Sequence, residues 1–475
     1  MRILHVGSGF RPWRLGGLVA YVEDLLSEQV RRGHEPAYLF SGRQYPFLRG
    51  PRLKRWQRPG IEMLEVVNSP LYDHGRQPEL EVAQPRLERM LERVLAETRP
   101  EVVHVHELAG LPFSALDVIH ASGTPAVVTL QDYFPLCSTF KLLDSEGKVC
   151  LRREIGADCV ATTASDPRDA GILIEATLMH HVTRNPRTRG LQRPALPLSR
   201  EIARVAVAHR RRREPASPLS PAAFQRRRKL NVERLNRADR VVAMSSRVAE
   251  IYKQLGVDPA RLITMQLTLA HIERLTPRRP RRDAPLTFAT LAGFESVPKG
   301  ALVLREALSR LTDAATEGRF RLLVFGTVDR RFEHEAARLP GVEVRGRYAP
   351  SQLDAMLDEV DVGILPSVWE EAYGYAGMEL LAKGIPVIAN AIGGMTDYTR
   401  DGETGWLNRS CSGEELARIM RGAIDHPEQV AELNQRLLAN RDSIVKPLAR
   451  HAEEMDSLYA ETIAARARTP QPSPG

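Results

Sequence analysis

The chain has 475 residues, 43% of them hydrophobic, which is enough for two or three domains with ordinary cores. No apolar run approaches the roughly 18 residues that a membrane-spanning helix needs, and residues 1–6 look like a strand and not a signal peptide. The four cysteines are too few for a disulfide framework, which favours a reducing cytoplasm, and the net charge of +8 points to anionic partners.

Short β-rich runs alternate with helical segments through the first half of the chain. Such alternation predicts a parallel, doubly wound α/β sheet. The predicted strands are residues 2–7, 35–40, 101–106, 125–130 and 240–244, and the predicted helices are 18–32, 112–121 and 247–255.

Residues 165–230 form a basic insertion in this half. Residues 181–230 contain fourteen arginines and lysines and two glutamates. Their net charge is +12, which leaves −4 for the rest of the chain. Such a patch suits an anionic membrane, a polyanionic acceptor or nucleic acid, and a solvated, partly helical insertion explains it equally well. The charges lack interleaved aromatic residues, so we expect no nucleic acid. Peripheral contact with an anionic inner membrane through the stretch from Arg210 to Lys229 stays open.

A proline- and arginine-rich stretch, residues 277–285, predicts a linker, after which a second α/β series begins. We therefore expect an N-terminal domain over 1–276 and a second domain over 286–440, followed by a closing helix and disordered tail over 441–475. Ligands of such sheets bind at the carboxyl ends of strands. The second-half strands are predicted at 286–291, 321–325, 342–345, 362–365 and 386–389, and a helical stretch at 428–464.

Residues 367–394 carry the clearest functional signal. Glu371 lies in a loop before a glycine turn, and Glu379 lies inside a short helix that is apolar on nearly every side. A buried carboxylate must be paired or functional. Helix N-termini attract phosphate, and carboxylates bind sugar hydroxyls through charge-assisted hydrogen bonds. This combination predicts a nucleotide-sugar site, with the diphosphate at Gly374, Tyr375 and Ala376 where the helix begins.

Three further loops bear on a diphosphate site. The loop after the first strand contains Gly16 and Gly17, whose backbone can approach an anion closely. Lys299 begins a helix in the second half, where it can neutralise a phosphate. The loop at residues 392–397 follows the glutamate helix, and we expect it to offer amides to the same ligand.

Polar residues end two strands of the first half, at His104 and His106 and at Gln131 and Asp132. They would face the diphosphate site from the acceptor side. The loop that follows holds Cys137, Cys150 and Cys159, whose spacing lacks the paired C-x2–4-C of structural zinc sites. A structural or metal-clipped loop over the acceptor side remains open.

These residues together resemble the retaining glycosyltransferases of family 4, the glycosyl transferases group 1, which have the two-domain GT-B fold. The resemblance rests on MRILHVGSGF with Gly16 and Gly17, on VVHVHELAG, VVTLQDYFPLC and ADRVVAMSSRV, and on the E-x7-E pair followed by GIPVIANAIGG. It implies two Rossmann-like domains that face each other across a cleft, and a sugar transfer from a nucleoside diphosphate to an acceptor hydroxyl.

The resemblance also implies roles for single residues. It places Glu379 on the ribose, Glu371 on the donor sugar and Lys299 on the diphosphate. Catalysis would involve Glu371, Lys299 and Gln131, with His106 and Asp132 on the acceptor side. Because Lys299 and a helix dipole stabilise the leaving group, no metal and no cofactor other than the donor is expected. The acceptor can be a glycan, a lipid-linked molecule or a small molecule.

Two positions depart from the family pattern. Phe294 stands where the family has an arginine, so a second phosphate cation would have to come from elsewhere, such as Arg14. Gln131 stands where the family has a histidine, and glutamine forms hydrogen bonds but carries no proton at neutral pH. Two alternatives therefore stay open: a GT-B pseudoenzyme that binds a nucleotide-sugar without efficient transfer, and a sugar-nucleotide epimerase.

Overall fold

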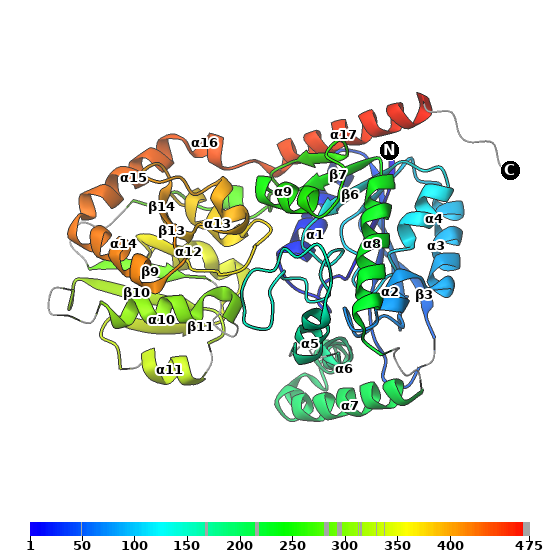
Figure 1. Ribbon diagram of the computed structural model, residues 1–475, viewed down its shortest axis with the longest axis horizontal. Coiled ribbons are helices and arrows are strands. Elements are labelled where there is room, and N and C mark those ends of the chain that lie inside the picture. Colours follow the sequence, from blue (N-terminus) through cyan, green and yellow to red (C-terminus); the bar gives the residue numbers. More distant parts are fainter. Residues whose placement is uncertain are drawn as a thin grey trace.

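The protein, seen as a computed structural model, folds into two halves, each built on a largely parallel β-sheet with helices packed around it (Figure 1). This confirms the predicted fold class of two doubly wound α/β domains. Phe294, residues 280–284 of the predicted linker and the tail from residue 469 lie outside the described residues. Those described are 1–48, 50–166, 170–213, 218–279, 285–291, 297–311, 313, 316–328, 330–336 and 338–468.

The N-terminal half contains an eight-stranded sheet with the order β3-β4-β2-β1-β5-β6-β7-β8. Neighbouring strands run parallel except β3 and β4, which form an antiparallel hairpin at one edge. The hairpin was not predicted because β3 is exposed and rich in arginine, a composition that also discourages pairing with other chains. The strands are β1 (Arg2–Gly7), β2 (Glu35–Ser41), β3 (Arg52–Arg58), β4 (Ile61–Val67), β5 (Val102–Val105), β6 (Ala126–Leu130), β7 (Arg240–Ala243) and β8 (Leu262–Thr264).

The basic insertion is helical. It supplies α6 and α7, which project from the sheet together with the preceding α5 at the bottom of Figure 1, and the first part of α8, which packs along the body. The helices of this half are α1 (Gly17–Arg31), α2 (Pro78–Val82), α3 (Pro85–Thr98), α4 (Ala115–Ala121), α5 (Ala157–Ser165), α6 (Ile172–Arg184), η1 (Arg189–Leu191), α7 (Gln192–Arg213), α8 (Pro221–Arg237), α9 (Ser246–Gln254) and η2 (Ile272–Arg274).

The C-terminal half contains a six-stranded sheet with the order β11-β10-β9-β12-β13-β14. Its elements up to residue 439 are β9 (Leu286–Thr290), η3 (Val297–Lys299), α10 (Ala301–Ser309), β10 (Phe320–Phe325), α11 (Arg330–Ala336), β11 (Val342–Gly346), η4 (Pro350–Gln352), α12 (Leu353–Leu357), β12 (Val362–Leu365), α13 (Tyr375–Ala382), β13 (Val387–Asn390), η5 (Gly393–Asp397), β14 (Gly405–Asn408), α14 (Gly413–Asp425) and α15 (Pro427–Ala439).

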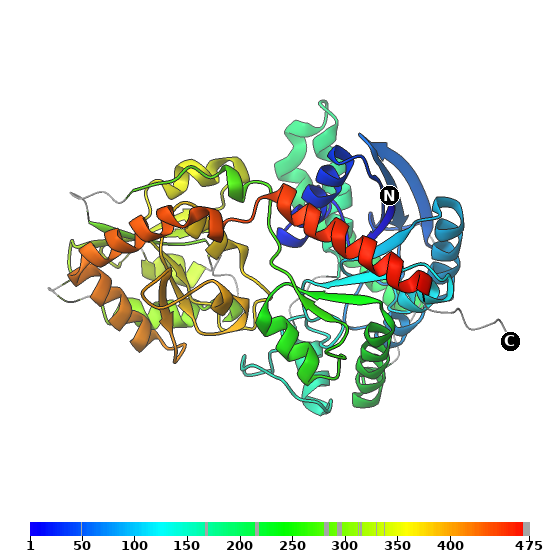
Figure 2. The same ribbon diagram turned by 90° about the horizontal axis from the view of Figure 1, so that it is seen from above.

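The end of the chain returns to the N-terminal half. The helical stretch predicted at 428–464 is divided into α15, α16 (Arg441–Ile444) and α17 (Leu448–Arg468). Figure 2 shows α17 crossing over the N-terminal half, where Tyr459 bonds to His104 at 2.7 Å. None of the described helices combines the length and apolar character that a membrane crossing requires.

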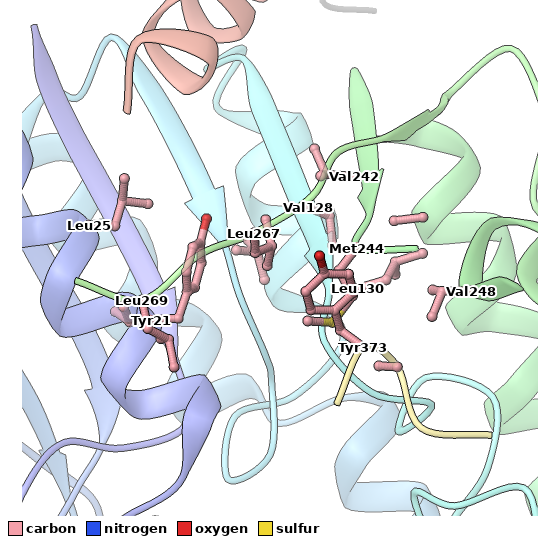
Figure 3. Packing of buried hydrophobic residues seen from close by; sticks show 14 of the residues in the cluster. Tyr21, Leu25, Val128, Leu130, Val242, Met244, Val248, Leu267, Leu269 and Tyr373 are labelled. Carbon is pink, nitrogen blue, oxygen red and sulfur yellow. The ribbon is translucent and has the colours of Figure 1, made fainter. Parts of the chain in front are cut away.

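The two halves share one apolar cluster. Tyr373, which precedes α13, is 4% exposed and packs in the same cluster as Leu130, Met244 and Val248 of the N-terminal half (Figure 3). The loop before α13 is therefore held against the carboxyl ends of β6 and β7. This contact fixes the approach of the two sheets at the candidate site.

Candidate functional site

The candidate site is built around the loop and helix that follow β12. The chain runs from β12 through a loop into α13 and then into β13, which is the strand–loop–helix–strand unit predicted from the sequence. Gly374 caps α13 with a φ of 76°, a left-handed conformation that favours glycine. Leu380 and Leu381 of this helix are buried in the core. The unpaired amides of its first turn, beginning at Tyr375 and Ala376, therefore have a fixed place.

Glu371 and Lys299 form an ion pair next to this turn. Lys299 Nζ lies 2.6 Å from Glu371 Oε1, and the same oxygen accepts hydrogen bonds from Ser367 Oγ at 2.6 Å and Trp369 Nε1 at 3.2 Å. Burial by itself would raise the pKa of Glu371, but the Lys299 ammonium and the three hydrogen bonds outweigh it and keep the pKa below its usual value. Glu371 is therefore an ionised and oriented carboxylate at neutral pH.

The position of Lys299 follows from the glycine beside it. Gly300 has a φ of 80°, and a Cβ atom there would lie 1.8 Å from the carbonyl oxygen of Pro366. Only glycine lets the two segments approach so closely. The backbone N–H of Val368 also donates to the Pro298 carbonyl at 2.9 Å. These contacts hold η3 against the loop before α13 and so bring the lysine to the carboxylate.

Glu379 has a different partner. Its Oε1 lies 2.7 Å from His271 Nε2, and its side chain is 13% exposed. His271 precedes η2, in the segment that leads out of the N-terminal half. The expectation that this carboxylate is paired is confirmed, although the sequence did not identify His271 because the two residues are far apart in the chain. The assignment of Glu379 to a ribose stays a prediction.

The glycine turn of the N-terminal half faces the start of α13. Gly16 caps α1, and a Cβ atom on Gly17 would lie 2.8 Å from Cδ2 of Tyr375. The structure thus brings Gly16 and Gly17 to Gly374 and Tyr375, as the sequence suggested. The hydroxyl of Tyr375 is buried and has no hydrogen-bond partner among the described residues.

A chain of buried hydrogen bonds orients Gln131. His5 Nε2 lies 2.8 Å from the amide oxygen of Gln29, so this ring nitrogen donates. His5 Nδ1 then accepts from His106 Nε2 at 2.8 Å, and His106 Nδ1 accepts from Gln131 Nε2 at 3.4 Å. Burial lowers the pKa of His5 to about 4 and that of His106 well below its usual value, so both rings are neutral at pH 7.

This order of donors fixes which way the Gln131 amide is turned. Its nitrogen faces His106, and its oxygen Oε1 is buried without a hydrogen-bond partner among the described residues. A cavity of about 30 Å³, large enough for about one water molecule, is lined in part by Gln131 and Asp132. Gln131 therefore presents a bare acceptor and not a donor.

Asp132 and Glu107 are two carboxylates beside this cavity. Burial raises the pKa of Asp132 well above its usual value, and the negative charge of Glu107 raises it further. Glu107 accepts a hydrogen bond from Ser8, and its Oε1 lies 3.4 Å from Arg14 Nη2. Arg14 is therefore already paired with a carboxylate of its own half. It is not directed at a phosphate site.

Among the described residues, the group of side chains that most resembles a metal site is a cluster of three histidines. Ligand atoms of His5, His104 and His106 lie within 4.8 Å of one another. Both nitrogens of His5 are already hydrogen-bonded, and those of His104 lie 2.7 Å from Tyr459 Oη and Thr129 Oγ1. The cluster is therefore fully explained as a hydrogen-bond network under α17.

Cys137, Cys150 and Cys159 are free thiols that line one small cavity together with Arg228. Burial raises the pKa of Cys159, so it is not an activated nucleophile. A metal clip at the loop after Asp132 stays a prediction.

Most arginines from residue 210 to 229 form ion pairs or hydrogen bonds with other residues of the protein. This corrects the interpretation of the stretch as a free basic patch. Arg227 pairs with Glu81, and both side chains are 2% exposed. Each of the two buried charges needs the other as its partner. The other pairs are Arg210 with Gln44 and Tyr45, Arg211 with Asp73, Arg226 with Glu79, and Arg228 with the carbonyls of Leu136 and Arg152.

A second interdomain ion pair was missed by the sequence. Arg247 of α9 binds Glu370, with Nε at 3.0 Å from Oε2, and Ser245 Oγ donates to the Ala372 carbonyl at 2.7 Å. Nothing local in the sequence marks Arg247 and Glu370 as partners. The amide of Gly393 also donates to Glu370, at 3.0 Å, so this amide is already engaged, and the expectation that the loop at 392–397 offers amides to a ligand stays a prediction.

Comparison with known proteins agrees with this arrangement. The model of the family "Glycosyl transferases group 1" matches residues 285–426, and that of the "Glycosyl transferase 4-like domain" matches residues 16–171, so that together they span more than half of the chain. The chain belongs to the glycosyl transferases group 1. This family assignment and the GT-B fold confirm the resemblance found in the sequence.

The chain is 27% identical over 204 residues to a D-inositol 3-phosphate glycosyltransferase of Corynebacterium aurimucosum, covering 40% of this chain and 48% of that protein. It is 27% identical over 242 residues to the lipopolysaccharide 1,2-N-acetylglucosaminetransferase of Salmonella typhimurium, covering 48% and 59%. The matches thus span about half of the length of these two relatives.

Solved structures share the fold over nearly the whole chain. HepE of Anabaena in complex with UDP has a TM-score of 0.58 at 13% identity, covering 97% of this chain and 100% of that chain. Sucrose-phosphate synthase of Thermosynechococcus elongatus has a TM-score of 0.60 at 15% identity, covering 98% and 100%. Both similarities support the two-domain architecture of this group 1 member.

Proposed function

We propose that the protein is a retaining glycosyltransferase that moves a hexose-type sugar from a nucleoside diphosphate to an acceptor hydroxyl bound in the N-terminal half. The observation that carries the proposal is the Lys299–Glu371 pair beside the first turn of α13, with the Gly16–Gly17 turn facing it from the other half. Membership of the group 1 family supports it. So does the likeness in fold to a protein that binds UDP.

In this proposal the diphosphate binds the amides at Tyr375 and Ala376 and the ammonium of Lys299. Both stabilise the negative charge that develops as the leaving group departs. Glu371 holds hydroxyls of the donor sugar, and Glu379 holds those of the ribose. These groups supply the charge stabilisation, so the proposal needs no metal ion and no further cofactor.

On the acceptor side, the bare oxygen of Gln131 accepts a hydrogen bond from a substrate hydroxyl. An amide cannot take up the proton at neutral pH. The acceptor hydroxyl therefore attacks on the face that the diphosphate leaves, its oxygen forms the new bond to the sugar carbon, and its proton passes to the departing phosphate oxygen. Attack on that face retains the anomeric configuration.

The first experiment is a thermal-shift screen with UDP-, GDP-, ADP- and TDP-sugars, because a ligand that binds only the folded state raises its melting temperature. Release of the nucleoside diphosphate is then measured with the stabilising donor. Lys299→Ala and Glu371→Ala should abolish release while the far-ultraviolet circular dichroism stays unchanged. Either variant turning over at the wild-type rate would remove its residue from the proposed role.

The same assay decides between the alternatives. A pseudoenzyme would be stabilised by a donor without releasing its diphosphate, and Gln131→His would then restore release. An epimerase would convert the donor sugar in the absence of any acceptor, which nuclear magnetic resonance of the donor detects.

We also propose a cytoplasmic protein that contacts an anionic membrane peripherally, now through the outward face of α7 in place of the stretch from Arg210 to Lys229. Leu191, at the end of η1, and Leu198 and Val205 of α7 recur every seven residues and are 55, 61 and 47% exposed. Arg200 and Arg204 of the same helix are 64% and 73% exposed, and they pair with Glu175 and Glu201. Co-sedimentation with vesicles should occur with anionic lipid and fail with phosphatidylcholine alone. Leu198→Asp should abolish it, and sedimentation with both lipids would contradict a role for charge.

A further inference from the structure

One large cavity of the N-terminal half has no role in the proposed reaction. Its volume is about 820 Å³, within the range of small-molecule sites. It opens at the carboxyl ends of β2 and β4, between the segments that follow these strands and the end of α7. The lining residues include Pro46, Phe47, Leu48, Pro51, Pro70, Tyr72, Leu80, Arg86, His209, Arg210 and Arg213.

The walls of the cavity are held in place by the protein itself. Asn68 joins the two loops, accepting from the backbone N–H of Tyr45 at 2.6 Å and donating to the Leu48 carbonyl at 2.9 Å. Arg210 ties α7 to the same loop through the Tyr45 carbonyl at 2.8 Å and lies 5.2 Å from the centre of the Tyr72 ring. The site is thus largely formed before any ligand arrives.

One side of the cavity is apolar and exposed. Phe47 and Leu48 are 69% and 47% exposed, although large apolar side chains usually gain by burial. Pro46, Pro51 and Leu80 continue this surface. A ligand that covers it must carry a hydrocarbon part.

The other side is cationic. Arg86 and Arg213 line the cavity beside His209, and neither arginine has an ion pair with a carboxylate among the residues that the structure describes. The lining carboxylate, Glu79, is already paired with Arg226 at 2.7 Å. Cations without carboxylate partners around a preformed cavity favour a phosphate or another compact anion.

The cavity is close to the proposed reaction centre along the sheet. In the strand order β4-β2-β1-β5-β6, β2 is the direct neighbour of β1, and the Gly16–Gly17 turn follows β1. Neighbouring strands lie about 4.8 Å apart, so β2 and β4 are one to two strand spacings from β1 and three to four spacings, roughly 14–19 Å, from β6, which Gln131 follows. A molecule anchored in the cavity can therefore extend one end to the donor sugar.

We propose that this cavity anchors the acceptor and that the acceptor is an amphipathic anion, a phosphate or pyrophosphate ester with a hydrocarbon chain. The anion binds Arg86, His209 and Arg213, and the chain lies on Phe47 and Leu48. The hydroxyl that receives the sugar points along the sheet to Gln131. The identification as an acceptor rests on the proposed transfer, but the binding of the anion does not.

The test is a calorimetric titration of the full chain with geranyl phosphate, geraniol and inorganic phosphate. Geranyl phosphate should bind, whereas the other two probes should each bind at least about tenfold more weakly because each lacks half of the recognition. The double variant Arg86→Ala/Arg213→Ala should weaken geranyl phosphate binding by about tenfold or more. Phe47→Ser should weaken it without affecting inorganic phosphate.

The matched control is Arg93→Ala, two turns further along α3 and outside the cavity, which should bind like the wild type. The wild type, the double variant, Phe47→Ser and Arg93→Ala should all bind UDP equally well. This result separates the site from the donor site. Equal affinity of the double variant, or of geraniol and geranyl phosphate, would overturn the proposal, as would tight binding of inorganic phosphate alone. Loss of transfer with geranyl phosphate binding intact would count against the proposed function and leave the anion site standing.

Discussion

Two substitutions that break the Lys299–Glu371 pair should have different effects on nucleotide binding. Without a ligand, Lys299 is neutralised by Glu371 at 2.6 Å. Lys299→Met removes one charge-assisted hydrogen bond to the diphosphate, worth about 1.5–3 kcal/mol, so UDP should bind about 10- to 150-fold more weakly. Glu371→Gln removes the competing carboxylate and leaves the lysine, so UDP affinity should stay the same or rise while sugar transfer falls.

The assay is isothermal titration with UDP, followed by the rate of diphosphate release at saturating donor. Lys253→Met, at an exposed position on α9, serves as the control for loss of a positive charge and should bind UDP like the wild type. Ser367 and Trp369 still donate to Glu371 in the Lys299→Met protein, so its fold should persist. If both substitutions weaken UDP binding equally, the lysine does not meet the diphosphate and the reasoning fails.

Three further predictions concern stability and the junction of the halves. Arg227→Met leaves a buried glutamate unpaired and should lower the free energy of unfolding by about 3–5 kcal/mol, whereas Arg226→Met breaks an exposed pair and should cost less than about 1 kcal/mol in the same urea titration. Gly17→Val places a side chain against the Tyr375 ring, so UDP binding should weaken while the melting temperature stays within a few degrees; unchanged binding would separate the turn from the donor. Burial lowers the pKa of His5 to about 4, so the unfolded chain takes up a proton below pH 6.5 that the folded protein refuses, and stability falls from pH 6.5 towards pH 4. His5 alone should cost about 2 kcal/mol at pH 5 relative to pH 8, a loss that His5→Gln removes and that urea titrations at both pH values would reveal.

The sequence predicts the parts of this protein that local patterns determine. The strand–loop–helix–strand unit around Glu371 and the glycine turn at Gly17 both follow from short-range signals, namely apolar periodicity and glycines at turns. The sequence also placed Lys299 and Glu371 at one site, because both belong to loops at one edge of a parallel sheet, but it did not predict their ion pair.

What the sequence did not predict depends on contacts between distant segments. His271 pairs with Glu379, and Arg247 with Glu370, across more than a hundred residues. The hairpin of β3 and β4 has an exposed strand without apolar alternation, so its pattern is that of a loop. The arginines of the basic insertion looked solvated because their buried partners, such as Glu81, lie in another part of the chain.

The return of α17 to the first half has a consequence for how the protein can be divided. The chain crosses between the halves twice, once after η2 and once before α17, so two connecting segments join the halves. Tyr459 of α17 completes the hydrogen bonds of His104, and Tyr21 of α1 bonds to His451 at 2.9 Å. A fragment that ends at the first crossing would leave these buried groups open to water. The smallest independently stable form of the N-terminal half is therefore discontinuous, and it includes the last helix of the chain.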